Sequence, residues 1–238
     1  LLVHPTLQMP AFTPFVSGGG PIVPGKLYPF VFITIACGAI SGFHALIASG
    51  TTPKLIENEG QLRFVGYGGM LMESFVAIMA LISATVIEPG VYFAMNSPAG
   101  LIGTNVAQAA QVISGWGFAI TPDMLTQIAK DVGEHTVLSR TGGAPTLAVG
   151  MAHILSGLLG GQTLMGLWYH FAILFEALFI LTTVDAGTRV TRFMIQDMVG
   201  TVAPGFRNTE SWTNNLIGSG LAALLWGYFL YQGVIDPL

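Results

Sequence analysis

Four stretches of the chain are long and apolar enough to cross a lipid bilayer. A spanning helix needs about 20 residues, because each residue advances the helix by about 1.5 Å. The stretches are roughly 29–50, 65–87, 163–184 and 213–235. A fifth apolar stretch, 145–160, is shorter and ends in two glycines, so we expect a half-helix or re-entrant segment there. The pattern predicts an all-α fold, a polytopic transmembrane helix bundle with a broken or re-entrant helix.

Positive charges orient the predicted spans, because Lys and Arg concentrate on the inner side of a membrane. The loop 51–64 and the stretch 185–212 together hold five of them, against three on the opposite side. We therefore expect these two segments inside and 97–144 outside. That scheme requires 145–160 not to cross fully, which its length indicates independently.

The predicted outer region 97–144 is patterned as helix rather than as an irregular loop. Apolar residues recur at helical spacing over 106–113 and again over 125–132. Thr121 is a suitable N-cap for the second helix, since Pro122 follows at its first position. On the inner side, 188–200 has an apolar face and predicts a short interfacial helix.

Composition identifies the chain as an integral membrane protein. Charged residues make up 8% of it and hydrophobic residues 52%, whereas soluble domains are about 25% charged. A net charge of −4 excludes the electrostatic footprint of a nucleic-acid-binding protein. The single cysteine excludes a disulfide framework. The first 25 residues hold five prolines and resemble an extramembrane loop rather than a signal peptide, so we expect a piece of a longer chain.

The first predicted span carries a seam of small and polar residues. Cys37, Ser41, His44 and Thr51 recur at helical spacing, and Gly42 forms a GxxxG motif with the glycine four residues before it. One interpretation is close helix packing, which needs only small residues. The other is a helix broken near Ser41 and Gly42, whose freed backbone groups face a cavity. On the second interpretation, we expect Ser41, Gly42, His44 and Thr51 to bind substrate.

Two carboxylates lie inside predicted spans, where ionisable groups usually serve a function. Glu176 is near the middle of the third span, with no Lys or Arg within eight residues. A carboxylate at that depth is either protonated or paired with a neighbouring helix. Glu73 lies about 12 Å inside the second span, although it could also extend to the inner interface. We expect Glu176 and Glu73 to carry a coupling proton, with a purely structural role as the alternative.

The chain carries none of the common enzyme motifs. HExxH, the P-loop and the GxSxG elbow are all absent from its sequence. We therefore predict no enzyme activity and no cofactor. A metal site drawing on His44, Glu73, His170 or Glu176 is a weaker third hypothesis. Asp185 and Arg189, four residues apart, form either a solvated ion pair or a gate.

Long runs of the sequence closely resemble the carbon starvation protein A family. These runs are ITIACGAISGFHALIASGTTPKLIENE, VGYGGMLMESFVAIMALISAT, EPGVYFAMNSPAG, GGAPTLAVG and WYHFAILFEALFILTTVDAGTRVTRFMIQD. The similarity extends from about residue 22 to residue 230. Because members of this family are much longer, the resemblance implies that the chain is an internal portion of one.

The resemblance implies a multi-pass transporter of the bacterial or archaeal inner membrane. Its substrates would be peptides or pyruvate, taken up with protons when carbon is short. The family is also grouped distantly with the amino acid–polyamine–organocation transporters, whose broken helices meet at the bilayer midplane. The expected partners are substrate, protons, membrane lipid and the remaining helices, without nucleic acid. A non-transporting membrane sensor or helix-packing subunit is the alternative, and the sequence does not separate peptide from pyruvate or proton from sodium.

Overall fold

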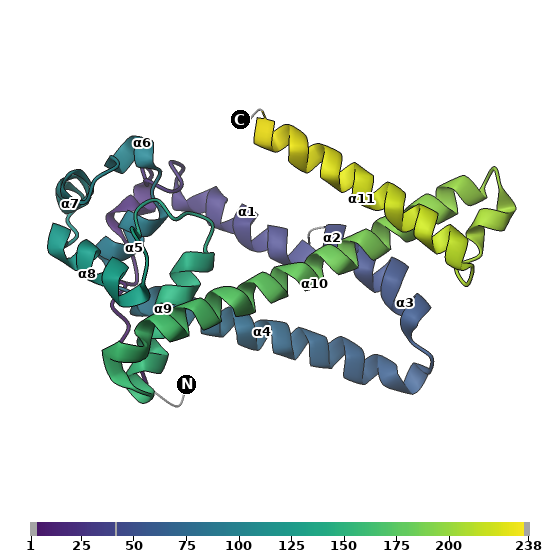
Figure 1. The fold of residues 1–238 in the computed structure, drawn as a ribbon, viewed down its shortest axis with the longest axis horizontal. Coiled ribbons are helices and arrows are strands. Elements are labelled where there is room, and N and C mark those ends of the chain that lie inside the picture. The colour runs from purple at the N-terminus through teal and green to yellow at the C-terminus, as the bar shows by residue number, and fades with distance from the viewer. Residues whose placement is uncertain (1–3, 41, 236–238) are drawn as a thin grey trace. The chain divides into compact units, whose positions relative to one another are not determined.

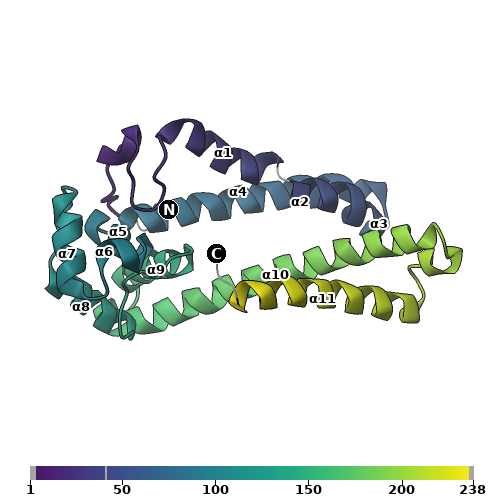
Figure 2. The same cartoon turned by 90° about the horizontal axis from the view of Figure 1, so that it is seen from above.

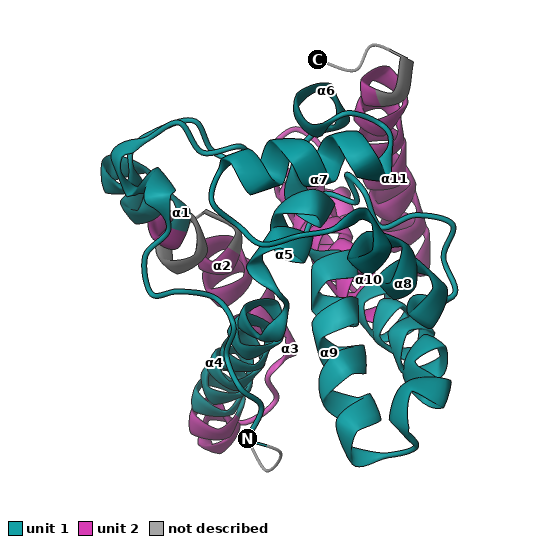
Figure 3. Ribbon diagram, turned by 90° about the vertical axis from the view of Figure 1, so that its left-hand side faces the viewer, with its two compact units in different colours: residues 1–34, 65–177 teal, residues 35–64, 178–238 magenta. Residues whose placement is uncertain are grey.

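The computed structural model describes the backbone of residues 4–40 and 42–235, and the side chains of residues 4–36 and 44–233. All regular secondary structure in these ranges is helical, which confirms the all-α prediction. The chain divides into two compact units, each described by itself (Figure 3). Unit 1 consists of Leu1–Thr34 and Val65–Ala177, and unit 2 of Ile35–Phe64 and Leu178–Leu238.

The helices follow one another with short connections (Figures 1 and 2). In chain order they are α1 (Leu27–Ile40), α2 (Gly42–Leu46), α3 (Thr52–Leu55), α4 (Leu62–Val86), α5 (Pro89–Asn96), α6 (Ala99–Ile102), α7 (Val106–Gly115), α8 (Pro122–Val132), α9 (Ala144–Leu158), α10 (Met165–Gly200) and α11 (Trp212–Ile235). A π-helical turn, Ile47–Thr51, separates α2 from α3. Turns of 3₁₀-helix occupy Pro14–Ser17, Glu59–Gln61, Gly161–Leu164 and Pro204–Arg207.

Two helical segments of the described chain are long and apolar enough to cross a membrane, judged by length and composition. They are Glu59–Val86 and Gly161–Gly200, which contain α4 and α10. These segments overlap the predicted spans 65–87 and 163–184. The predicted span 29–50 is divided among α1, α2 and the π-helical turn, and 213–235 forms α11, which is less apolar. The four-span topology therefore remains a prediction.

Helix α10 is longer than a bilayer requires. Its 36 residues extend about 54 Å, against a hydrocarbon thickness of about 30 Å. The expected short helix at 188–200 is the continuation of α10 and not a separate element. No proline interrupts it, and the helix ends at Gly200, four residues before Pro204.

Unit 1 contains a closely packed hydrophobic core built mainly by α5, α7, α8, α9 and the start of α10. Its members include Val91, Met95, Ile102, Ile113, Leu125, Val132, Val149, Ala152 and Tyr169, all of them buried. Burying one such large apolar side chain contributes about 1.5–3 kcal/mol. This core gives the predicted outer region a fixed tertiary structure, as the teal helices of Figure 3 show.

The two helices predicted in the region 97–144 are present as α7 and α8. The Thr121 hydroxyl accepts a hydrogen bond from the Met124 amide at 3.3 Å, so Thr121 is the N-cap that the sequence indicated. At the other end of α8, Gly133 adopts a left-handed conformation that ends the helix. The sequence reasoning did not predict α5 or α6, which are too short to show a clear apolar period.

An aromatic cluster attaches the N-terminal segment to unit 1. Phe93 stacks on Phe118 with ring centroids 4.6 Å apart, and Phe15 meets the edge of Phe93 at 5.4 Å. Trp116 completes the cluster against Phe15. Such pairs contribute about 0.5–1.5 kcal/mol beyond their burial. The segment that was expected to be an extramembrane loop is thus packed against the core of its own unit.

Helix α9 lies against the backbone of α4 at a glycine. A Cβ placed on Gly150 would overlap the carbonyl group of Ser83. That group belongs to the backbone of α4, so it cannot move aside as a flexible side chain would. Gly157, on the same helix, has no such neighbour, since a Cβ there meets nothing within 4 Å. The packing of α9 on α4 therefore depends on one position.

We expect Gly150→Ala to lower the free energy of unfolding by about 1–3 kcal/mol, because the added methyl forces α9 away from α4. Gly157→Ala is the matched control and should be neutral or slightly stabilising, since alanine favours helix. Thermal unfolding of the detergent-solubilised protein measures both variants. Equal melting temperatures for the two variants would contradict the close contact.

Candidate functional site

The structure describes two of the four predicted substrate residues in full. Ser41 lies outside the described residues, and of Gly42 only the backbone, at the start of α2, is described. His44 is exposed on α2, whereas Thr51 is buried, with 5% of its surface exposed. Both residues belong to unit 2. The predicted helix break near Ser41 and Gly42 thus remains untested.

The predicted proton-coupling residues both lie in unit 1. Glu73 is exposed on α4, and Glu176 is half-buried on α10. Among the described residues, Glu176 forms no hydrogen bond or ion pair, so no cation of this part of the chain compensates its charge. Their role in proton coupling stays a prediction.

Thr51 closes the π-helical turn Ile47–Thr51. Threonine hydroxyls elsewhere in these helices donate to the carbonyl four residues earlier, as Thr34 and Thr188 do at 3.0 and 2.8 Å. The Thr51 hydroxyl is buried and has no hydrogen-bond partner in the described structure. π-Helical turns are rare in proteins, and those that occur are often at functional sites. The predicted seam therefore contains an irregular turn, which begins inside the predicted span 29–50 and ends one residue beyond it.

Lys54, just after this turn, connects α3 to α10. Its ammonium group lies 3.5 Å from Asp197 Oδ2 and 4.4 Å from the ring centre of Phe193. The guanidinium carbon of Arg192 lies 4.8 Å from the centre of the same ring. Cation–π contacts of this kind contribute about 0.5–1 kcal/mol at exposed sites. Two cations thus share one aromatic ring.

In unit 2, a hydrogen bond between two amide side chains, buried Gln196 and half-buried Asn215, connects helices α10 and α11. Gln196 Nε2 donates to Asn215 Oδ1 at 3.0 Å, and Gln196 is 1% exposed. Its own Oε1 is buried without a partner among the described residues. Together these contacts define the polar cluster of unit 2. Its members are Lys54, Arg192, Phe193, Gln196, Asp197 and Asn215.

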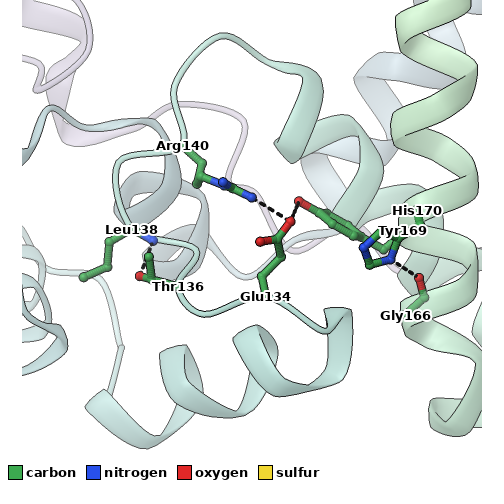
Figure 4. A network of polar contacts seen from close by, with 7 residues as sticks. All are labelled: Glu134, Thr136, Leu138, Arg140, Gly166, Tyr169 and His170. Carbon is green, nitrogen blue, oxygen red and sulfur yellow. Dashed lines mark hydrogen bonds and ion pairs between the residues drawn. The ribbon is translucent and has the colours of Figure 1, made fainter.

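A second polar network lies in unit 1, where Glu134 accepts two contacts (Figure 4). Arg140 Nη2 lies 2.7 Å from Glu134 Oε1, and the Tyr169 hydroxyl donates to the same oxygen at 3.4 Å. The hydrogen bond to Glu134 raises the pKa of Arg140, with burial opposing it. The network attaches the segment after α8 to the first turns of α10.

His170 is next to this network but faces its own helix. Its Nδ1 lies 2.8 Å from the carbonyl oxygen of Gly166, as Figure 4 shows. Because a carbonyl only accepts, Nδ1 carries a proton in this contact. The sequence also raised a metal site drawing on His44, Glu73, His170 or Glu176. In the described part of the chain, no three His, Cys, Asp or Glu side chains lie close enough together to hold a metal ion.

Sequence reasoning missed most members of both networks. It used Lys54, Arg192 and Arg140 only to orient the spans, and it did not single out Gln196 or Asn215. The spacing of four between Arg192 and Gln196 places them on one helix face, which was a usable signal. The partners Glu134 and Tyr169 are 35 residues apart, and no local pattern indicates such a contact. The ion pair of Asp185 with Arg189, at 3.0 Å, was proposed from spacing and is present.

We expect Glu134→Gln to weaken the attachment of the segment after α8, because it removes the ion pair with Arg140. Both side chains are partly exposed, so the loss should be about 1 kcal/mol. Faster hydrogen exchange over 133–140 would measure it. Tyr169→Phe is the graded comparison: it keeps the ring and removes only the longer bond, so its effect should be smaller. A larger effect of Tyr169→Phe would contradict the ion pair as the main contact.

Arg140 keeps its positive charge in this network over a wide range of pH. A cation whose pKa is raised on folding contributes stability that is present below its unfolded pKa and is lost as pH rises through the folded one. The pKa of Arg140 is raised from an already basic value. Its side of the ion pair is therefore maintained throughout the physiological range.

Comparison with known proteins shows what the chain is related to. The family model described as carbon starvation protein CstA matches residues 1–238. The peptide transporter CstA of Escherichia coli is 66% identical over 243 residues, and that of Campylobacter jejuni 60% over 238. The pyruvate/proton symporter BtsT of Escherichia coli is 54% identical over 260 residues.

Each of these alignments covers 100% of this chain, but 35%, 34% and 36% of the respective relative. The chain thus spans about a third of the length of the curated relatives it matches. No solved structure matches it significantly. The family match covers every residue, and the chain therefore belongs to the carbon starvation protein CstA family.

Proposed function

We propose that this chain is part of a secondary transporter that takes up peptides or pyruvate together with protons. The observation that carries the proposal is the identity of 66% and 54%, over the whole chain, to relatives named as a peptide transporter and a pyruvate/proton symporter. These names favour transport over a sensor or a helix-packing subunit. The apolar helices α4 and α10 agree with a membrane location, which we propose to be the bacterial inner membrane, crossed several times.

Peptides and pyruvate share a carboxylate group, so their common site must offer positive charge or hydrogen-bond donors. We place it beside the first predicted span, at Ser41, Gly42, His44 and Thr51. The π-helical turn supports this placement, because it departs from regular helix and buries an unpartnered hydroxyl at Thr51. A distant likeness to the amino acid–polyamine–organocation transporters would fit such an irregular helix, and it is part of the proposal.

We assign the coupling proton to Glu176, with Glu73 as a second carrier. A carboxylate in a membrane helix is costly when charged, and a compensating cation reduces that cost. Glu176 has no such cation among the described residues and sits on the more apolar part of α10. A group in this position can take up a proton from one side of the membrane and release it to the other during the transport cycle.

We expect Glu176→Gln to lower the rate of uptake driven by a pH gradient at least about tenfold, measured in proteoliposomes of the full-length transporter. The amide keeps the shape of the side chain but cannot exchange a proton. Asp123→Asn, on the surface of α8, is the matched control and should transport normally. Normal proton-driven uptake by Glu176→Gln would remove this residue from the coupling step.

We expect Thr51→Val to weaken substrate binding without lowering thermal stability. The hydroxyl has no partner to lose in the described structure, so removing it is neutral or slightly stabilising for the fold. The KM for uptake should rise if the hydroxyl contacts substrate. Thr188→Val, which removes a hydroxyl already bonded to Val184 O, is the control and should leave KM unchanged. An unchanged KM in Thr51→Val would exclude the hydroxyl from the substrate site.

A further inference from the structure

Arg192 differs from the neighbouring cations of unit 2 because no carboxylate of the described residues pairs with it. Arg189 pairs with Asp185 at 3.0 Å, and Lys54 pairs with Asp197 at 3.5 Å. Among the described residues, Arg192 has no carboxylate within ion-pair distance. Its Nε is buried and lacks a hydrogen-bond acceptor there. A buried Nε–H without an acceptor is unfavourable, and Arg192 has no counter-charge of its own, so we expect an anion from outside this part of the chain beside it.

Arg192 lines a pocket of about 450 Å³ against α11. The other lining residues are Trp212, Asn215, Leu216, Ser219 and Gly220. The pocket therefore has a polar end, formed by Arg192, Asn215 and Ser219, and an apolar wall. Trp212 and Leu216 are 77% and 58% exposed, so this wall continues onto the surface of α11. The combination suits a ligand with an anionic head and a hydrocarbon tail.

The position of Arg192 is fixed by its neighbours rather than left to a flexible side chain. A Cβ on Gly218 would lie 2.9 Å from Arg192 Cγ, so the absence of a side chain there admits the stem of the arginine. Gln196, almost fully buried, holds Asn215 at the pocket through the bond at 3.0 Å. The pocket is thus a built site with a buried polar residue behind it.

We propose that this pocket binds the phosphate headgroup of an anionic phospholipid. Arg192 supplies the opposite charge, the Ser219 hydroxyl donates a hydrogen bond, and an acyl chain lies along Trp212 and Leu216. Asn215 Nδ2 already donates one hydrogen to the Thr209 carbonyl at 2.8 Å, and its second hydrogen is available for the phosphate. Tryptophan is enriched at membrane interfaces, and basic pockets near the inner ends of spanning helices bind anionic headgroups. The stretch 185–212 is the one whose positive charge predicts an inner location.

A small substrate fits this pocket less well than a lipid. Sites for small molecules enclose most of the ligand surface. Here the wall formed by Trp212 and Leu216 is open, and it matches a hydrocarbon chain better than a soluble carboxylate. The lipid site is therefore distinct from the proposed substrate site near Thr51, and it goes beyond the proposed transport function.

The test uses the purified full-length protein in a neutral detergent. Phosphatidylglycerol, added in increasing amounts, should raise the melting temperature of the wild type, whereas phosphatidylcholine should not. Arg192→Gln should raise the apparent Kd for phosphatidylglycerol at least about tenfold, because a charge-assisted contact to phosphate is lost. Arg207→Gln, which removes an exposed cation of the same loop region, is the matched control and should keep the wild-type Kd.

A second pair of variants keeps the test informative if Arg192→Gln folds poorly. Gly218→Ala displaces the arginine stem and should also weaken phosphatidylglycerol binding. Gly227→Ala, on the same helix with nothing within 4 Å of the added methyl, should not. Native mass spectrometry of the lipid-bound protein gives an independent readout of both variants.

Three results would overturn the proposal. Stabilisation by pyruvate or a dipeptide that depends on Arg192, without one by phosphatidylglycerol, would make the pocket a substrate carboxylate site. No effect of any anion would indicate that another part of the full-length protein covers Arg192. Equal phosphatidylglycerol binding in wild type and both test variants would place the lipid elsewhere. Because the readout is lipid binding, a failure of the transport hypothesis leaves this test intact.

Discussion

Hydrogen bonding of the backbone within its own helix is the constraint on which the rest of this structure depends. No water satisfies peptide groups in the apolar core of a membrane, and a helix satisfies them within its own segment, as the helices of this chain that would meet lipid do. Hydroxyl side chains follow the same rule, since Ser74 and Thr188 donate hydrogen bonds to the carbonyl oxygen four residues earlier in the same helix. Against this regular background, the π-helical turn before α3 and its unpartnered hydroxyl at Thr51 stand out as irregular.

Three of the cations lie beside a carboxylate. Arg140, Arg189 and Lys54 pair with Glu134, Asp185 and Asp197, and each of these side chains is at least partly exposed. None of these pairs is fully buried, so each contributes modestly to stability. Their larger effect is on position, because each pair holds a long side chain in one place.

Periodicity predicted the elements that bury one face. The stripe over 125–132 gave α8 with its cap at Thr121, because a helix with one apolar side leaves a period of 3.6 in the sequence. It could not give the length of α10, since Asp185 and Arg189 are compatible with either a helix end or a helix that leaves the bilayer. Nor could it give the Glu134–Arg140–Tyr169 network, which depends on how α8 and α10 pack and not on local spacing.

The π-helical turn Ile47–Thr51 sets the rotational register of the residues that follow it. Such a turn accommodates one residue more than an α-helical turn, because its hydrogen bonds join residues five apart instead of four. Removing one residue there would restore the α-helix and rotate everything after it by about 100° around the axis, at 3.6 residues per turn. Lys54 would then face away from Phe193 and Asp197. The contacts of Lys54 with Asp197 and Phe193 therefore depend on the one additional residue in this turn.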